Sequence, residues 1–182
     1  MNISTNHSWT AITYPQDFSD EGLGLGEKTI YRLRKIVDVK QDRTYNIQAI
    51  VLASGFGPDR DEYPNQHKSF EAMMAEWLIS EGKISKEIIH CSNNPKVWNC
   101  IEMTLEMIHI MKTRNLPKNV LIVSNYHHIY PRMWTTWMLL CGKKYGWRLA
   151  FCPENNGTSK FFHEIGGTVK YIPMALWHRH SI

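Results

Sequence analysis

The amino-acid sequence predicts an α/β fold: a Rossmann-like three-layer sandwich with a mainly parallel sheet of about five strands and helices on both faces. Two β-branched apolar runs, at 47–53 and 119–123, have the continuous hydrophobic character of strands that are covered on both faces. Strand-like and helix-like segments alternate along the chain with short connections, the order that is typical of parallel sheets. A length of 182 residues, without a repeat or a long linker, predicts a single domain over residues 1–182.

The predicted strands are short apolar segments that end in small or polar residues. The runs at 47–53 and 119–123 are the clearest of them, and the others are less continuous. In chain order, strands are predicted at 9–14, 47–53, 87–91, 119–123, 148–152 and 168–172.

The first two helices are predicted from apolar residues spaced three or four apart, which form one face of a helix. The first stripe runs from Ile30 to Val37. The second runs from Phe70 to Leu78, and Gly82 closes that helix because glycine readily takes the conformation that ends one.

The third helix has the clearest start and stop signals. Asn94 is predicted as its N-cap, Pro95 takes the first helical position, and Asn115 and Pro117 mark its end. Its apolar stripe consists of Val97, Ile101, Leu105, Ile108 and Met111.

Two further helices follow towards the C-terminus. One is predicted to begin at Pro131 and to end before Gly146, and the other covers 158–165 and ends at Gly166-Gly167. The inward face of the former is predicted to consist of Trp134, Trp137, Met138 and Cys141.

Composition and charge exclude several classes of protein. Apolar residues make up 43% of the chain and charged residues 21%, as in a folded globular domain. The net charge of +4 comes from scattered Lys and Arg, so no nucleic-acid interaction is expected. No run has the length of a membrane span, and Met1 to His7 lack the features of a signal peptide. The four cysteines form no C-x-x-C pair and indicate free thiols, so we expect a cytoplasmic protein without membrane contact.

The loop after the predicted strand 47–53 contains Ser54-Gly55-Phe56-Gly57 and then Arg60. Glycines directly after a strand let the backbone approach a ligand closely, and an arginine can pair with an anion. The alternative is a tight turn that needs glycine for its geometry alone. The sequence is neither the dinucleotide fingerprint G-x-G-x-x-G nor a P-loop.

The loop after the predicted strand 119–123 is rich in polar side chains: Ser124, Asn125, His127, His128 and Arg132. It precedes a helix start, where the helix dipole favours anions. His128 could transfer a proton and Arg132 could hold a phosphate or a carboxylate. The alternative is a capping loop whose histidines only bond the backbone.

The sequence predicts no metal site, because adjacent histidines rarely both face one metal ion. Nucleophilic hydrolysis has little support either. No G-x-S-x-G elbow is present, and Cys91 and Cys152 have no obvious partner.

Several polar features follow one another in an order that matches a known pattern. They are Arg32 in a first helix, Ser54-Gly55-Phe56-Gly57 after a strand, Glu71-Ala72 at a helix start, Asn99, and Ser124-Asn125 with His128 and Arg132. In this order the chain resembles the YdcF/SanA/ElyC-like family, a bacterial Rossmann-like domain of poorly defined function. The resemblance implies that Arg32, Glu71 and Asn99 belong to the ligand site. The chain departs from the family at Lys96 and Trp98, which stand where the family has Thr and Glu.

Together these features predict a site for an anionic, nucleotide-like or phosphorylated small molecule at the carboxyl ends of the strands. A transferase or hydrolase would use His128 for proton transfer and Glu71 as a second carboxylate. The alternative is a non-catalytic module that uses the same scaffold to sense a ligand or to bind a protein. The fold class is compatible with a nucleotide or S-adenosylmethionine as cofactor, and the sequence gives no oligomeric state.

Overall fold

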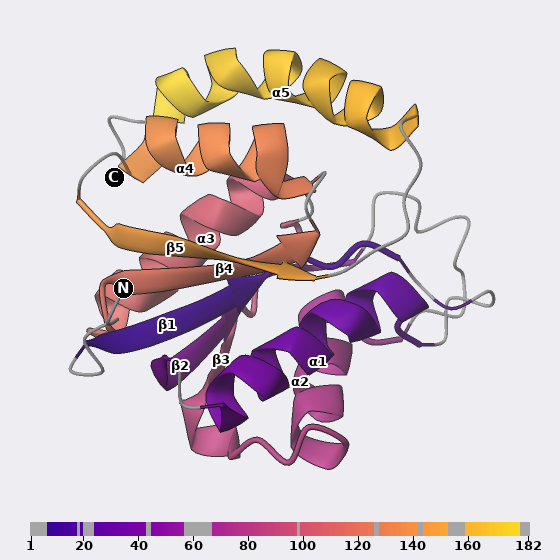
Figure 1. The fold of residues 1–182 in the computed structure, drawn as a ribbon, viewed down its shortest axis with the longest axis vertical. Helices are drawn as coiled ribbons and strands as arrows, with labels where there is room; N and C mark the ends of the chain where they lie inside the picture. Colours follow the sequence, from indigo (N-terminus) through magenta and orange to yellow (C-terminus); the bar gives the residue numbers. More distant parts are fainter. Residues whose placement is uncertain are drawn as a thin grey trace.

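The structure, a computed structural model, describes residues 7–17, 19, 24–42, 45–56, 67–97, 99–125, 128–141, 144–152 and 159–178. Its centre is a five-stranded sheet in the order β3-β2-β1-β4-β5, and every pair of neighbouring strands is parallel (Figure 1). This arrangement confirms the predicted α/β fold class. The strands are β1 (Ser8–Thr13), β2 (Asn46–Leu52), β3 (Ile89–Cys91), β4 (Asn119–Asn125) and β5 (Gly146–Cys152).

Helices cover both faces of the sheet. In Figure 1, α1 and α2 lie on one side of it, α3 and α4 lie on the other, and α5 runs over the outside of α4. The helices are α1 (Glu27–Gln41), α2 (Phe70–Ser80), the short 3₁₀ helix η1 (Lys86–Ile88), α3 (Cys100–Thr113), the π-helical turn η2 (His128–Met133), α4 (Trp134–Cys141) and α5 (Ser159–His178).

The strands supply two cores because their side chains alternate between the two faces. In β2, Ile50 and Leu52 pack under α1 and α2, whereas Val51 faces α3 and α4. The continuous apolar run that predicted this strand therefore reflects burial on both faces.

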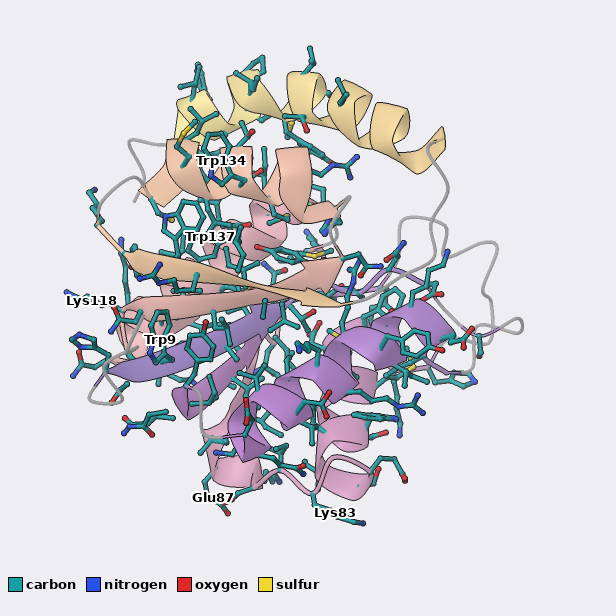
Figure 2. All side chains as sticks on the ribbon, viewed as in Figure 1. Trp9, Lys83, Glu87, Lys118, Trp134 and Trp137 are labelled. Carbon is teal, nitrogen blue, oxygen red and sulfur yellow. The ribbon has the colours of Figure 1, made fainter. Side chains whose placement is uncertain are left out.

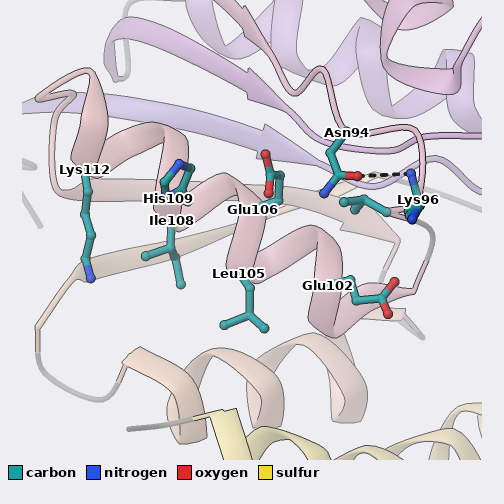
Figure 3. Close-up of a pocket in the computed structure, with 9 residues that line it drawn as sticks. Asn94, Lys96, Glu102, Leu105, Glu106, Ile108, His109 and Lys112 are labelled. Atoms are coloured by element: carbon teal, nitrogen blue, oxygen red, sulfur yellow. Dashed lines mark hydrogen bonds between the residues drawn. The ribbon is translucent and has the colours of Figure 1, made fainter. Parts of the chain in front are cut away.

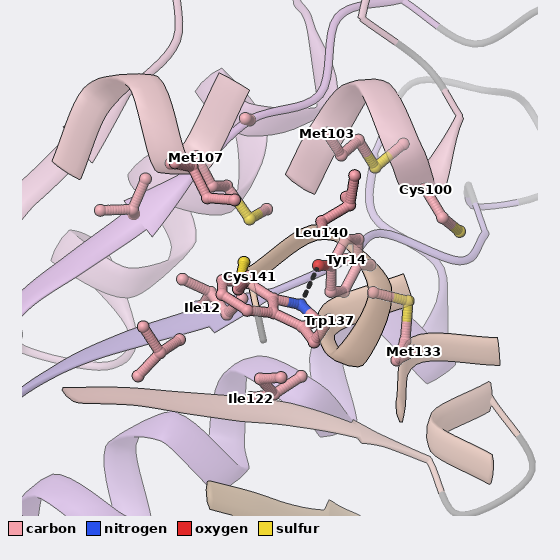
Figure 4. Close-up of a cluster of buried hydrophobic side chains, with 14 of the residues drawn as sticks. Ile12, Tyr14, Cys100, Met103, Met107, Ile122, Met133, Trp137, Leu140 and Cys141 are labelled. Carbon is pink, nitrogen blue, oxygen red and sulfur yellow. Dashed lines mark hydrogen bonds between the residues drawn. The ribbon is translucent and has the colours of Figure 1, made fainter. Parts of the chain in front are cut away.

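In the core between the sheet and helices α3 and α4, a tyrosine and a tryptophan are hydrogen-bonded to each other. Trp137 of α4 is fully buried, and its indole Nε1 donates to the Tyr14 hydroxyl at 3.0 Å (Figure 4). The same hydroxyl lies 2.9 Å from Thr104 Oγ1 of α3. Buried polar groups on large aromatic side chains need such partners, and these bonds tie α3 and α4 to the end of β1.

The predicted inward face of α4 is partly wrong. Trp137 and Cys141 are buried as expected, but Trp134 is 37% exposed and Met138 is 40% exposed. Figure 2 shows Trp137 between α4 and the sheet. The buried stripe starts one residue earlier than predicted, at Met133, because the π-helical turn η2 precedes α4 and brings Met133 into the core.

The predicted start of α3 at Asn94 and Pro95 is wrong. The helix begins at Cys100, and Asn99 is its N-cap, with Oδ1 accepting the N–H groups of Ile101 and Glu102 at 3.0 Å each. The backbone at Pro95 instead accepts a hydrogen bond from Phe56 N–H at 3.3 Å. Tertiary pairing with the loop after β2 therefore outweighs the local preference of proline for a helix start.

The strand predicted at 168–172 is also wrong. Helix α5 runs without interruption through Gly166-Gly167 to His178. Thr168 and Ala175, seven residues apart on one face of the helix, are buried, and Tyr171 and Met174 are partly buried against the core of α3 and α4. Burial at this helical spacing, rather than the local preference of the two glycines, determines the conformation of this segment.

The outer face of α5 is apolar as well, with Val169 64% exposed and Trp177 82% exposed. No helix in the described part of the chain combines the length and the apolar character that a membrane crossing requires.

Gly55 is required for a close approach of two backbones. A Cβ atom there would lie 2.1 Å from the carbonyl oxygen of Pro95, and Gly55 N–H donates to Val97 O at 2.5 Å. We expect Gly55→Ala to lower the free energy of unfolding by about 1–3 kcal/mol, measured by urea denaturation, because the backbone has to move. The control is Gly166→Ala, where no atom lies within 4 Å of the added carbon in an exposed helix. That change should be neutral or stabilising, and equal losses in the two variants would contradict the packing role.

Candidate functional site

The site lies beyond two neighbouring strands whose connections lead to opposite faces of the sheet. Neighbouring strands β1 and β4 both end at the same edge, but β1 leads to α1 on one face and β4 leads to η2 and α4 on the other. In open parallel sheets the connections diverge at such a point and leave a crevice beyond the strand ends.

A cavity of about 220 Å³ occupies this crevice. It combines two cations, an imidazole, two amides and a thiol with apolar walls. Its lining residues are Pro15, Gln16, Arg32, Asn99, Cys100, Met103, His128, Arg132 and Tyr171. We call it the switch-point cavity.

Arg32 is a buried lining residue of the switch-point cavity and is held by three hydrogen bonds. Its guanidinium is almost fully buried, and it donates from Nε to Asn125 Oδ1 at 2.6 Å and from Nη1 to the Tyr14 carbonyl at 2.6 Å. Its Nη2 donates to Gln16 Oε1. The planar fork of donors thereby fixes the ends of β1 and β4 and places a positive charge beside the cavity.

His128 is held by both of its ring nitrogens. Nδ1 lies 2.8 Å from Ser124 Oγ, and Nε2 lies 3.4 Å from Cys100 Sγ. The edge of the ring packs against Tyr14, with ring centres 5.7 Å apart. Burial lowers the pKa of His128 well below its usual value, and the charges of Arg32 and Arg132 lower it further. The imidazole is therefore neutral at pH 7, and one of its ring nitrogens carries a lone pair.

Arg132 supplies the second cation. Its guanidinium lies over the ring of Tyr171 from α5, 5.4 Å from the ring centre. This contact holds the side chain beside the cavity. Its Nε is buried and has no hydrogen-bond acceptor among the described residues.

Cys100 is a site residue that the sequence analysis missed. Placing the helix start at Asn94 put Cys100 inside a helix, where it resembled a core residue. The available signal was Asn99, which is also a good N-cap and would have placed the thiol in the first turn, next to a strand-end loop.

A second cavity lies beyond the ends of β2 and β3, with a volume of about 340 Å³. It is lined by Phe56, Ser69, Glu71, Ala72, Cys91, Ser92, Asn93 and Pro95. The structure therefore separates the two residues predicted to act together as catalytic groups, because Glu71 lines this cavity and His128 lines the switch-point cavity.

Glu71 is hydrogen-bonded to the backbone of Ser54 in the loop after β2. It is only 4% exposed, and its Oε2 accepts the N–H of Ser54 at 2.8 Å, while its own N–H donates to Ser54 O at 3.2 Å. Burial raises the pKa of Glu71 to about 7 despite these hydrogen bonds. The backbone N–H groups of Ser54 and Gly55 both donate to acceptors within the protein, so these two N–H groups do not face a ligand.

The other predicted site residues are partly described. Asn99 and Arg132 line the switch-point cavity. Ser124 and Asn125 do not line it, but they are hydrogen-bonded to two residues that do, His128 and Arg32 respectively. Gly57, Arg60 and His127 lie outside the described residues. Within the described ranges no group of three His, Cys, Asp or Glu side chains could hold a metal ion.

A third pocket, of about 490 Å³, lies along α3 (Figure 3). It is lined by Asn94, Lys96, Val97, Glu102, Leu105, Glu106, Ile108, His109 and Lys112. Its charges are mixed, with lysines and glutamates interspersed, so it selects neither anions nor cations. The switch-point cavity has a defined charge and is the better candidate site.

Comparison of the chain with models of known protein families, with curated proteins and with solved structures gave no match.

Proposed function

We propose that the protein binds an anionic small molecule, phosphorylated or nucleotide-like, in the switch-point cavity. The observation that carries this proposal is the convergence of Arg32 and Arg132 on one cavity at the ends of parallel strands. Guanidinium groups bind phosphate and carboxylate oxygens through charge-assisted hydrogen bonds. The amides of Gln16 and Asn99 line the same cavity and could bond further oxygens.

The size of the cavity favours the phosphate part of a ligand. About 220 Å³ is less than the roughly 300–1,000 Å³ of cavities that enclose a drug-sized molecule. A phosphate or pyrophosphate group needs less room, and the rest of a larger ligand would lie outside the cavity.

Calorimetric titration with inorganic pyrophosphate tests the proposal directly. We expect the wild-type protein to bind it, and Arg132→Met to weaken binding by about tenfold or more, because a charged hydrogen bond contributes roughly 1.5–3 kcal/mol. The matched control is Arg34→Met, which removes an exposed arginine of α1 and should leave affinity unchanged. The proposal fails if the wild-type protein does not bind, or if the two variants bind alike.

Catalysis in this site would use His128, which lines the cavity, for proton transfer. A transferase or hydrolase should lose turnover in His128→Ala and retain most of its affinity for the ligand. A non-catalytic sensor, the alternative, binds the ligand and has no turnover to lose. Membership of the YdcF/SanA/ElyC-like family and a cytoplasmic location stay predictions.

A further inference from the structure

We propose that Cys100 is a nucleophile in the switch-point cavity, that His128 is its base, and that it attacks the phosphorus of a phosphate ester. This inference deepens the proposed function and rests on it for the class of substrate. It adds a covalent step, which anion binding alone does not require.

The position of the thiol supports a role as nucleophile. Cys100 lines the cavity together with Arg32, Arg132 and His128, and its Sγ lies 3.4 Å from His128 Nε2. It is also the first residue of α3, a helix of 14 residues, so its sulfur lies near the positive end of the helix. Guanidinium groups and a helix N-terminus stabilise the negative charge that develops on a sulfur during attack on an electrophile.

The other ring nitrogen of His128 has a hydrogen-bond partner of its own. Ser124 Oγ lies 2.8 Å from Nδ1 and can accept a hydrogen bond from an Nδ1–H group. In that tautomer the lone pair of Nε2 faces the thiol of Cys100 and can take its proton. Nucleophile, base and a third group that orients the base are the parts of an activated nucleophile.

Two other thiols, Cys91 and Cys141, lack these surroundings. Burial raises the pKa of Cys91 to about 11, and the charge of Glu71 contributes to the rise. Burial raises the pKa of Cys141 to about 12. Neither thiol lies within hydrogen-bond distance of a histidine in the described part of the chain. These two cysteines are therefore internal references for the reactivity of Cys100.

The proposed reaction transfers the phosphoryl group first to Cys100 and then to water. The proton of the Cys100 thiol passes to His128 Nε2 as a bond forms between Sγ and phosphorus. The bond from phosphorus to the ester oxygen breaks, and this oxygen takes the proton from Nε2 and leaves as an alcohol. Water then attacks the phosphorus, releases phosphate and returns the thiol. Arg32 and Arg132 would bind the non-bridging oxygens throughout.

Alkylation by iodoacetamide measures the nucleophile without any substrate. The full-length protein is treated at pH 7, and the modification of each cysteine is followed over time by peptide mass spectrometry. We expect Cys100 to react about tenfold or more faster than Cys91 and Cys141, and His128→Gln to remove most of this advantage. Equal rates at the three cysteines, or an unchanged rate in His128→Gln, would overturn the proposal.

A second variant tests the role of His128 in case His128→Gln does not fold. Ser124→Ala removes only a hydroxyl group and should slow Cys100 about threefold to tenfold, because the imidazole loses its orienting partner. Circular dichroism of each variant confirms that it is folded. An unchanged rate in a folded Ser124→Ala protein overturns the assigned tautomer and with it the role of His128 as base.

Protection by inorganic phosphate connects the thiol to the substrate class. Phosphate should slow the alkylation of Cys100 in the wild-type protein and should not affect Cys141. A reactive Cys100 without protection overturns phosphate as the substrate group and leaves the nucleophile standing. Pyrophosphate binding with an unreactive Cys100 overturns this inference and leaves the proposed function standing.

Discussion

Arg32→Met is expected to lower the free energy of unfolding by about 3 kcal/mol or more, and to abolish the binding of pyrophosphate. Three acceptors lose a charged donor in this variant: Asn125 Oδ1, the Tyr14 carbonyl and Gln16 Oε1. Each such loss leaves a polar atom without its partner at about 1 kcal/mol or more. Urea denaturation measures the loss of stability, and calorimetry measures the loss of binding.

Two further variants separate charge from geometry at this position. Arg32→Lys keeps the positive charge but cannot donate in a plane to three acceptors, so we expect an intermediate stability. Arg34→Met removes an exposed arginine on the same helix and should change stability by no more than about 0.5 kcal/mol. An Arg32→Met protein as stable as Arg34→Met would show that the guanidinium does not hold the strand ends together.

The sheet could be predicted from the sequence because its signal is local. The segment 49–53 is apolar at successive positions, which is typical of a strand covered on both faces. The same reasoning could not give the order of the strands, since parallel strands pair across long stretches of chain. From the sequence alone, the loops after β2 and β4 were therefore predicted to form one site. In the structure β1 lies between these strands, and the loops belong to two cavities.

The candidate site was predicted only in part for a similar reason. His128 and Arg132 stood out because they follow a clear strand in a polar loop, and they do line the switch-point cavity. Cys100 did not, because a thiol in an apolar stretch of sequence resembles a core residue until its spatial neighbours are known. The 3.4 Å approach to His128 joins residues 28 positions apart, and it exists only once the chain has folded.

Glu71→Gln is expected to change the pH dependence of stability. The folded protein keeps the proton of Glu71 up to a pH of about 7, because burial raises its pKa, whereas the unfolded chain releases it near 4.5. Between these values the folded state holds more protons, so wild-type stability falls as the pH rises. A shift from 4.5 to about 7 corresponds to roughly 3 kcal/mol, which is fully lost above pH 7.

The glutamine variant keeps an oxygen that can accept the Ser54 N–H group but has no proton to release. Its free energy of unfolding should be equal to or slightly lower than that of the wild-type protein near pH 4.5. Near pH 8 it should be higher than the wild-type value by about 2–3 kcal/mol. His128 acts in the opposite direction, since its lowered pKa makes the fold lose stability as the pH falls below about 6.5. That contribution is common to both proteins and cancels in their difference. The control is Glu76→Gln, an exposed carboxylate on the same helix that pairs with Lys68. If the difference between Glu71→Gln and wild type stays constant from pH 5 to pH 8, Glu71 is ionised in the folded protein and the buried, protonated carboxyl is wrong.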